Sequence, residues 1–91
     1  MRQLPAQLEA YKRTPEFTAD SIPAGLLKSH STKSGTWGKI VILEGQLWYR
    51  ILEPELEVIL LNPSCYGVVE PCIEHEVSPH GPVRFYVEFF R

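Results

Sequence analysis

The 91-residue sequence predicts one all-β domain, built as a sandwich or a small barrel. Three observations lead to this class. Stretches rich in β-branched and aromatic residues recur roughly every 8 to 12 residues, Pro and Gly separate them, and almost no stretch has the periodicity of a helix. Many short strands with turns between them are typical of β-sandwiches and barrels.

The first third of the chain contains the weakest strand signals. Residues 1–12 predict a helix of one or two turns or a flexible arm, because Leu8 and Tyr11 have helical spacing and Pro5 limits the length. Residues 13–23 are rich in Pro, Thr and Ser and predict a loop. Residues 25–30 predict a short strand that ends at His30.

Residues 35–52 predict the central hairpin of the fold. Two apolar stretches, 37–43 and 46–52, meet at Glu44-Gly45. Gly can adopt a positive φ angle without steric cost, which a two-residue hairpin loop requires. We therefore expect the two stretches to pair with each other as antiparallel strands.

The remaining strands are expected at residues 56–61, 65–69, 72–77 and 83–90. Pro residues interrupt the sequence between them, and Ser78-Pro79-His80-Gly81-Pro82 is the strongest turn signal in the chain. The last stretch alternates regularly, with residues 83, 85, 87 and 89 apolar and residues 84, 86, 88 and 90 on the opposite face.

Composition restricts the possible partners and compartment. The net charge is −2 and no Lys/Arg cluster occurs, so neither nucleic acid nor an anionic membrane is expected as a partner. The longest apolar runs have four residues, far fewer than a membrane-spanning helix needs. The first ten residues lack the apolar centre of a secretory signal. We expect a cytoplasmic protein whose two cysteines, Cys65 and Cys72, stay reduced and unpaired.

Several blocks of the sequence resemble the cupin superfamily. Gly45 matches the glycine that closes the first cupin motif, and Gly67, Pro71 and His75 match the second motif. The blocks 23–27, 30–33, 37–45 and 81–91 resemble, more closely, a small family related to tellurite resistance proteins, whose members stand alone or precede a methyltransferase domain. The resemblance covers roughly residues 10–91. It implies a small cupin-like double-stranded β-helix, a jelly-roll barrel of short antiparallel strands, over residues 1–91, and we expect no room for a methyltransferase domain in a chain of this length.

The resemblance also implies a metal site, although this chain lacks two of the usual cupin ligands. Metal-binding cupins carry a second His and a Glu in the first motif, where this chain has Thr32 and Gly38. His30 and His75 remain. We expect them to bind one divalent transition metal (Zn, Ni, Fe or Mn), with Glu88 or water completing the shell. The alternatives are that the histidines only line a pocket and that Glu88 faces outward.

Three functions stay open on this evidence. The first is a cytoplasmic cupin-fold protein that binds a metal or a small anionic ligand and is linked to tellurite, metalloid or oxidative stress; its predicted ligand-binding residues are Thr32, Arg84 and Tyr86. The second is a metal-dependent enzyme on a reduced His/His/carboxylate site, for which no catalytic residue is predicted. The third is a protein interaction module. A homodimer is expected, through an exposed edge strand or an apolar sheet face, because a small barrel leaves sheet edges unpaired.

Overall fold

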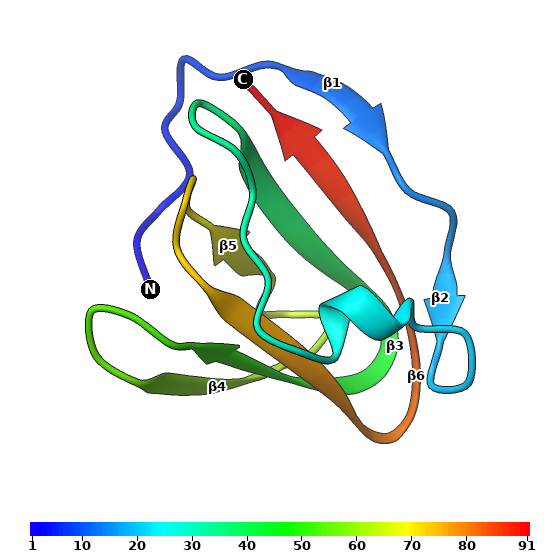
Figure 1. The fold of residues 1–91 in the computed structure, drawn as a ribbon. Helices are drawn as coiled ribbons and strands as arrows, with labels where there is room; N and C mark the ends of the chain where they lie inside the picture. Colours follow the sequence, from blue (N-terminus) through cyan, green and yellow to red (C-terminus); the bar gives the residue numbers. More distant parts are fainter.

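The computed structural model describes all 91 residues and consists almost entirely of strands. It has six strands and one short 3-10 helix: β1 (Ala10–Arg13), β2 (Phe17–Thr18), η1 (Ala24–Leu26), β3 (Trp37–Ile51), β4 (Glu57–Leu61), β5 (Gly67–Val69) and β6 (His75–Phe90). Two of these strands, β3 and β6, are much longer than the others and run through the whole molecule (Figure 1).

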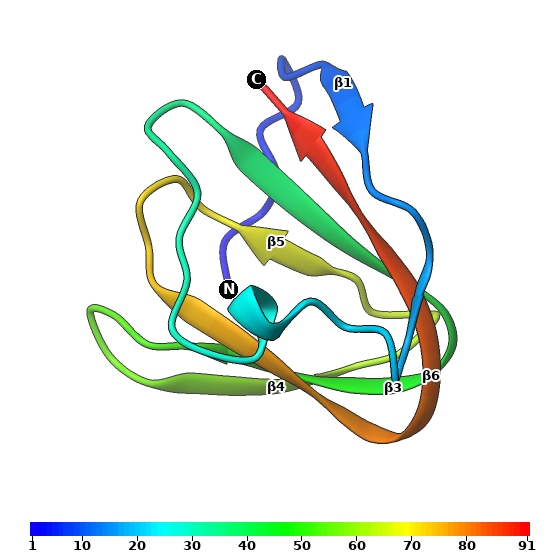
Figure 2. The ribbon, with the colours of Figure 1, turned by 45° about the vertical axis from the view of Figure 1, so that its right-hand side comes forward.

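β3 and β6 form one long antiparallel ribbon that bends in the middle. Their register runs from Trp37 opposite Phe90 to Ile51 opposite His75. It shifts twice, between Ile42 and Glu44 and again between Gly45 and Leu47. Bulges of this kind bend a strand and increase its twist. Both strands curve together in Figures 1 and 2. As a result, the two halves of each strand lie in two different layers of the barrel.

The short strands extend each half of the ribbon. One layer contains the first half of β3, which pairs with β5, and the second half of β6, which pairs with β1 and β2. The other layer contains the second half of β3, which pairs with β4, and the first half of β6. Figure 2 shows the two layers facing each other. The prediction of an all-β, cupin-like barrel is confirmed.

The core lies between the two layers. The residues on the inward face of β6 alternate with outward ones as the sequence predicted, and Phe85 is fully buried. The Tyr49 hydroxyl donates a hydrogen bond of 2.8 Å to the Val68 carbonyl, which ties β3 of one layer to β5 of the other. Ten buried residues form the core cluster: Ile40, Ile42, Leu47, Tyr49, Leu61, Val69, Val77, Val83, Phe85 and Val87.

The predicted hairpin at Glu44-Gly45 is wrong, because β3 continues through it. Residues 37–43 pair with β6 and not with residues 46–52. Gly45 does adopt a positive φ of 79°. Here the glycine permits a bend and a close crossing, since a Cβ atom at this position would overlap the Pro82 carbonyl oxygen. A positive φ therefore bends this strand without reversing it.

The predicted turn at residues 78–82 is wrong for a related reason. β6 continues through both prolines, and Pro79 lies opposite Leu47, beside the register shift of β3. Proline is tolerated at bulges because the lost ladder hydrogen bond would be absent there in any case. The turn signal marks the bend of β6, and Gly81 at its centre has a φ of 73°.

The beginning of the chain also differs from the prediction. Residues 1–12 form no helix, and residues 10–13 instead pair as β1 with the end of β6. Residues 25–30 form no strand: Ala24–Leu26 is a 3-10 helix, and His30 makes only an isolated bridge to His75. The chain has no helix of the length and apolarity that crossing a membrane would need.

Candidate functional site

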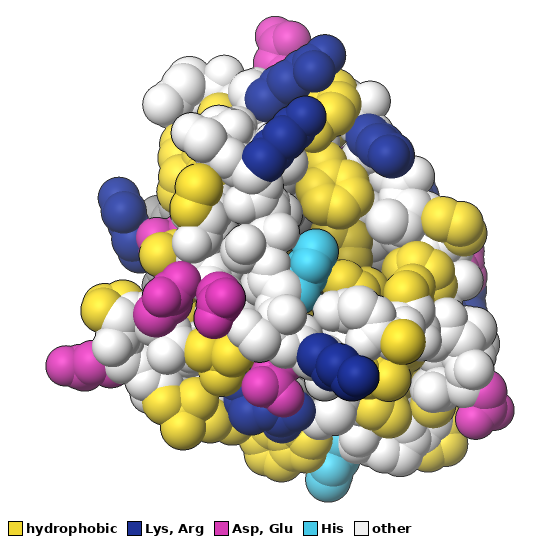
Figure 3. All heavy atoms as spheres, in the orientation of Figure 1, with side chains coloured by type: hydrophobic (Ala, Val, Ile, Leu, Met, Phe, Trp, Pro, Cys, Tyr) yellow, Lys and Arg dark blue, Asp and Glu magenta, His cyan; other side chains and the backbone are white.

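A hollow of about 300 Å³ opens between the two layers beside η1. Figure 3 shows hydrophobic side chains along a depression in this face of the molecule, with a histidine beside it. Most of the lining is apolar, and its polar side chains are two histidines and two threonines. The lining residues are Thr14, Phe17, Pro23, Gly25, Leu26, His30, Thr32, Gly38, Ile40, Val69, His75, Val77, Phe85, Val87 and Phe89.

The two histidines of the hollow lie directly opposite each other on neighbouring backbone segments. The His30 amide donates to the His75 carbonyl at 2.9 Å, and the His75 amide donates to the His30 carbonyl at 2.8 Å. Their rings meet edge to face, with centroids 5.3 Å apart. The fold thus brings together two residues with 44 others between them in the sequence.

The protonation state of His75 follows from its surroundings. Its Nδ1 atom lies 3.0 Å from the Ile73 carbonyl oxygen, which can only accept a hydrogen bond, so Nδ1 carries the hydrogen. Burial, with a smaller effect of His30, lowers the pKa of His75 despite the hydrogen bond to Ile73. The neutral ring therefore keeps a lone pair on Nε2. Since no buried polar side-chain atom lacks a partner, and Nε2 has none within the chain, this atom is accessible.

The two threonines of the hollow already use their hydroxyl hydrogens. Thr32 donates to the Thr36 carbonyl at 2.8 Å. Thr14 donates to the Pro15 carbonyl at 2.9 Å and accepts a hydrogen bond from the Val87 amide at 2.9 Å. Neither hydroxyl therefore has a hydrogen left to donate to a ligand. Of the three predicted ligand-binding residues, the structure places Thr32 at the hollow.

The other predicted site residues of β6, namely Arg84, Tyr86 and Glu88, do not line the hollow, because they alternate with the inward-facing residues of the strand. Arg84 donates to Glu16 at 2.7 Å and to Glu44 at 3.0 Å. The Cζ atom of Arg13 lies over the Tyr86 ring, 3.7 Å from the ring centroid.

Glu88 is opposite Arg13 on one neighbouring strand and Lys39 on the other. The structure therefore does not bring Glu88 to the histidines. The alternation in the sequence correctly separated the two faces of β6, but it could not say which face the hollow would occupy.

The side chains at the histidine pair do not fit a resident metal ion. No group of three His, Cys, Asp or Glu side chains is arranged to hold one. At the two positions where metal-binding cupins supply further ligands, Thr32 has a neutral hydroxyl in place of an imidazole, and Gly38 has no side chain. A Cβ atom at Gly38 would lie 3.1 Å from the Val69 Cβ atom, so there is little room for one. Two imidazoles are fewer than the three protein ligands of catalytic zinc sites.

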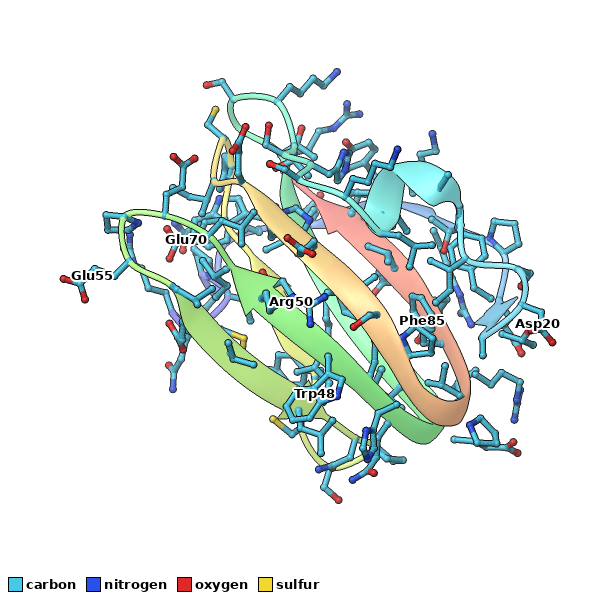
Figure 4. All side chains as sticks on the ribbon, turned by 60° about the horizontal axis from the view of Figure 1, so that its bottom comes forward. Asp20, Trp48, Arg50, Glu55, Glu70 and Phe85 are labelled. Carbon is cyan, nitrogen blue, oxygen red and sulfur yellow. The ribbon has the colours of Figure 1, made fainter.

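A second, larger depression of about 530 Å³ lies at another end of the barrel, and the sequence analysis did not identify it. Glu53, Glu55, Glu57 and Glu70 contribute to its lining, and Figure 4 shows Glu55 and Glu70 at the same end of the molecule. The Met1 ammonium group pairs with Glu57, and Arg2 lies 3.7 Å from Glu70. The alternating glutamates at positions 53, 55 and 57 are the sequence pattern from which this acidic depression could have been predicted. The chain's own N-terminal residues compensate part of this charge.

Comparisons with known proteins agree on one family. The TehB-like domain family matches residues 12–87. The chain is 36% identical over 76 residues to a probable S-adenosyl-L-methionine-dependent methyltransferase TehB of Haemophilus influenzae strain KW20 Rd, and 33% identical to that of strain 10810. Each alignment covers 79% of this chain but only 27% of the relative.

Solved structures show the same relationship. A crystal structure of TehB from H. influenzae superposes with a TM-score of 0.85 at 30% identity, over 93% of this chain and 32% of that one. A crystal structure of a protein from E. coli strain K12 superposes with a TM-score of 0.89 over 100% of this chain and 97% of that one, and its 23% identity shows a shared fold. The family match and the similarity to TehB establish that this chain belongs to the TehB-like domain family, which is related to tellurite resistance.

Proposed function

We propose that this domain is a cytoplasmic small-molecule-binding module, and that the ligand occupies the hollow beside His30 and His75. The observation that carries the proposal is a concave, largely apolar space in which a few polar groups converge. Ligand sites in proteins typically have this composition, and a volume of about 300 Å³ lies at the small end of their range.

The arrangement of the histidines supports a binding role over a purely structural one. His75 is only 5% exposed, yet its Nε2 lone pair has no partner within the chain. The Ile73 carbonyl holds the ring in one tautomer, which is how proteins orient imidazoles that meet a ligand. The accessible Nε2 atom can therefore accept a hydrogen bond from a molecule in the hollow.

The proposed module belongs to a tellurite-resistance-related system. In H. influenzae TehB, the part similar to this chain is a minor share of a longer, probable methyltransferase. We propose that the domain holds a small molecule for that system, either alone or beside an enzyme. The free thiols of Cys65 and Cys72 fit a reducing compartment.

The experiment compares binding to the wild-type protein and to a variant whose hollow is obstructed. Gly25 lines the hollow, and a Cβ atom added there meets nothing within 4 Å. Gly25 is exposed, so Gly25→Trp should fold and place a large side chain at the edge of the hollow, where it would obstruct ligand entry. Leu27→Trp is the matched control, because Leu27 is 40% exposed and does not line the hollow.

A panel of small neutral and charged aromatic molecules is titrated into each protein while the backbone amides are followed by NMR. We expect the shifts to concentrate on the hollow in the wild type and the control and to disappear in Gly25→Trp. Equal responses in all three proteins, or none in any, would contradict the proposal. In the second case an interaction module becomes the better description.

A further inference from the structure

We infer that the hollow selects a neutral, mostly apolar molecule that carries a hydroxyl group, such as a phenol, and that it rejects anions. This inference rests on the proposed function and names its ligand class. It differs from the small anionic ligand that the sequence alone suggested.

Counting hydrogen-bond donors and acceptors supports this class. The hydroxyl hydrogens of Thr14 and Thr32 are committed to backbone carbonyls, so both oxygens can only accept from a ligand. His75 commits its Nδ1 hydrogen to Ile73, so its Nε2 atom can only accept as well. Only His30, whose ring makes no hydrogen bond within the chain, is left to donate. A ligand must therefore bring at least one hydrogen of its own.

The position of the two imidazoles suits a hydroxyl group in particular. A hydroxyl donates one hydrogen bond and accepts another. The ring centroids of His30 and His75 are 5.3 Å apart, so a hydroxyl beside the pair is close to both rings, where it would donate to Nε2 of His75 and accept an N–H hydrogen bond from His30. An ether oxygen of the same size lacks the hydrogen and would leave Nε2 unpaired.

The charges around the hollow disfavour an anion. No Lys or Arg side chain lines it, and the one cationic residue predicted for ligand binding, Arg84, is engaged by two glutamates on the outer face. An oxyanion would face the lone pairs of three acceptors in an apolar surrounding. Burying a charge without a partner costs more than burying a neutral polar group.

The test uses three probes that share a 4-methylphenyl group and differ in one substituent: 4-methylphenol, 4-methylanisole and 4-methylbenzoate. Each is titrated into the wild-type protein and into Gly25→Trp, with NMR detection of the backbone amides and of the imidazole nitrogens. We expect 4-methylphenol to bind roughly threefold to tenfold more tightly than 4-methylanisole, as one net hydrogen bond allows. It should shift Nε2 of His75, and 4-methylbenzoate should bind more weakly than both.

The outcomes separate this inference from the proposed function. If no probe binds, or if binding survives Gly25→Trp, the proposed function fails and the inference fails with it. If the probes bind in the hollow but 4-methylanisole or 4-methylbenzoate binds as well as 4-methylphenol, the function stands and the ligand class is wrong. His75→Phe should remove the preference for the phenol. If that variant does not fold, the inference is judged from the wild-type protein, in which 4-methylphenol must shift the Nε2 signal of His75.

Discussion

Replacing Gly45 by Ala tests the account of the bend, because two separate costs meet at this residue. Its φ angle of 79° is unfavourable for a residue with a Cβ atom. The added Cβ would also overlap the Pro82 carbonyl oxygen and lie 3.0 Å from the Val83 Cα atom. Both obstacles belong to backbone, which cannot rotate away as a flexible side chain could.

Two other glycines separate these costs. Gly35 has a φ of 81° but nothing within 4 Å of an added Cβ, so Gly35→Ala is destabilised by the φ angle alone. Gly25 has open space and no positive φ, so Gly25→Ala involves neither the unfavourable φ angle nor the steric overlap. A positive φ destabilises a residue with a Cβ atom by about 1–2 kcal/mol. Replacing Gly by Ala also makes the unfolded chain less flexible, which stabilises the folded protein by about 0.4–1 kcal/mol. Forcing the two strands apart adds about 1–3 kcal/mol.

We therefore expect Gly45→Ala to lower the free energy of unfolding by about 2–4 kcal/mol and Gly35→Ala by about 1 kcal/mol or less, whereas Gly25→Ala should raise it by about 0.4–1 kcal/mol. Urea unfolding followed by the fluorescence of Trp37 and Trp48 measures all three, with an unchanged m value as the condition for comparing midpoints. The melting temperature of Gly45→Ala should fall by roughly 10–30 °C. If Gly45→Ala and Gly35→Ala cost the same within about 0.5 kcal/mol, the close crossing at Pro82 is not what requires the glycine.

Four further predictions concern the site and the surface. Tyr49→Phe should cost about 1–3 kcal/mol in urea unfolding, because it leaves the buried Val68 carbonyl without its donor; no measurable loss would refute the link between layers. Since burial lowers the pKa of His75 in the folded protein, the unfolded chain binds its proton more readily, so stability should be full above about pH 6.5 and decline below it. His75→Gln should flatten that decline, and an unchanged slope would count against it. After incubation with Zn²⁺ and desalting, elemental analysis should find less than one equivalent retained, since only two imidazoles are available; a full equivalent that His75→Ala abolishes would restore the metal site. Val58 is 50% exposed on the edge strand β4, so if this edge joins two chains, Val58→Lys should convert a dimer into a monomer in sedimentation, and a wild-type monomer would refute the expected homodimer.

The sequence by itself determined the fold class and most of the strand positions, because both depend on local patterns. Alternation in residues 83–90 identified the last half of β6 and correctly separated its two faces. The pattern also gave the strands at residues 57–61 and 67–69 to within two residues. The cupin-like motifs singled out His30 and His75, which the structure does place side by side.

The tertiary structure alone decided which segments pair and which face holds the site. A glycine with positive φ can reverse a strand or bend it, and only the close crossing at Pro82 selects the bend at Gly45. Alternation separates Val87 from Glu88 but is the same whichever side the second layer covers. The second layer covers the side of Val87, so Glu88 faces outward and the histidines have only apolar neighbours and acceptors. Periodicity is a property of one strand, whereas pairing and burial depend on residues far away in the chain.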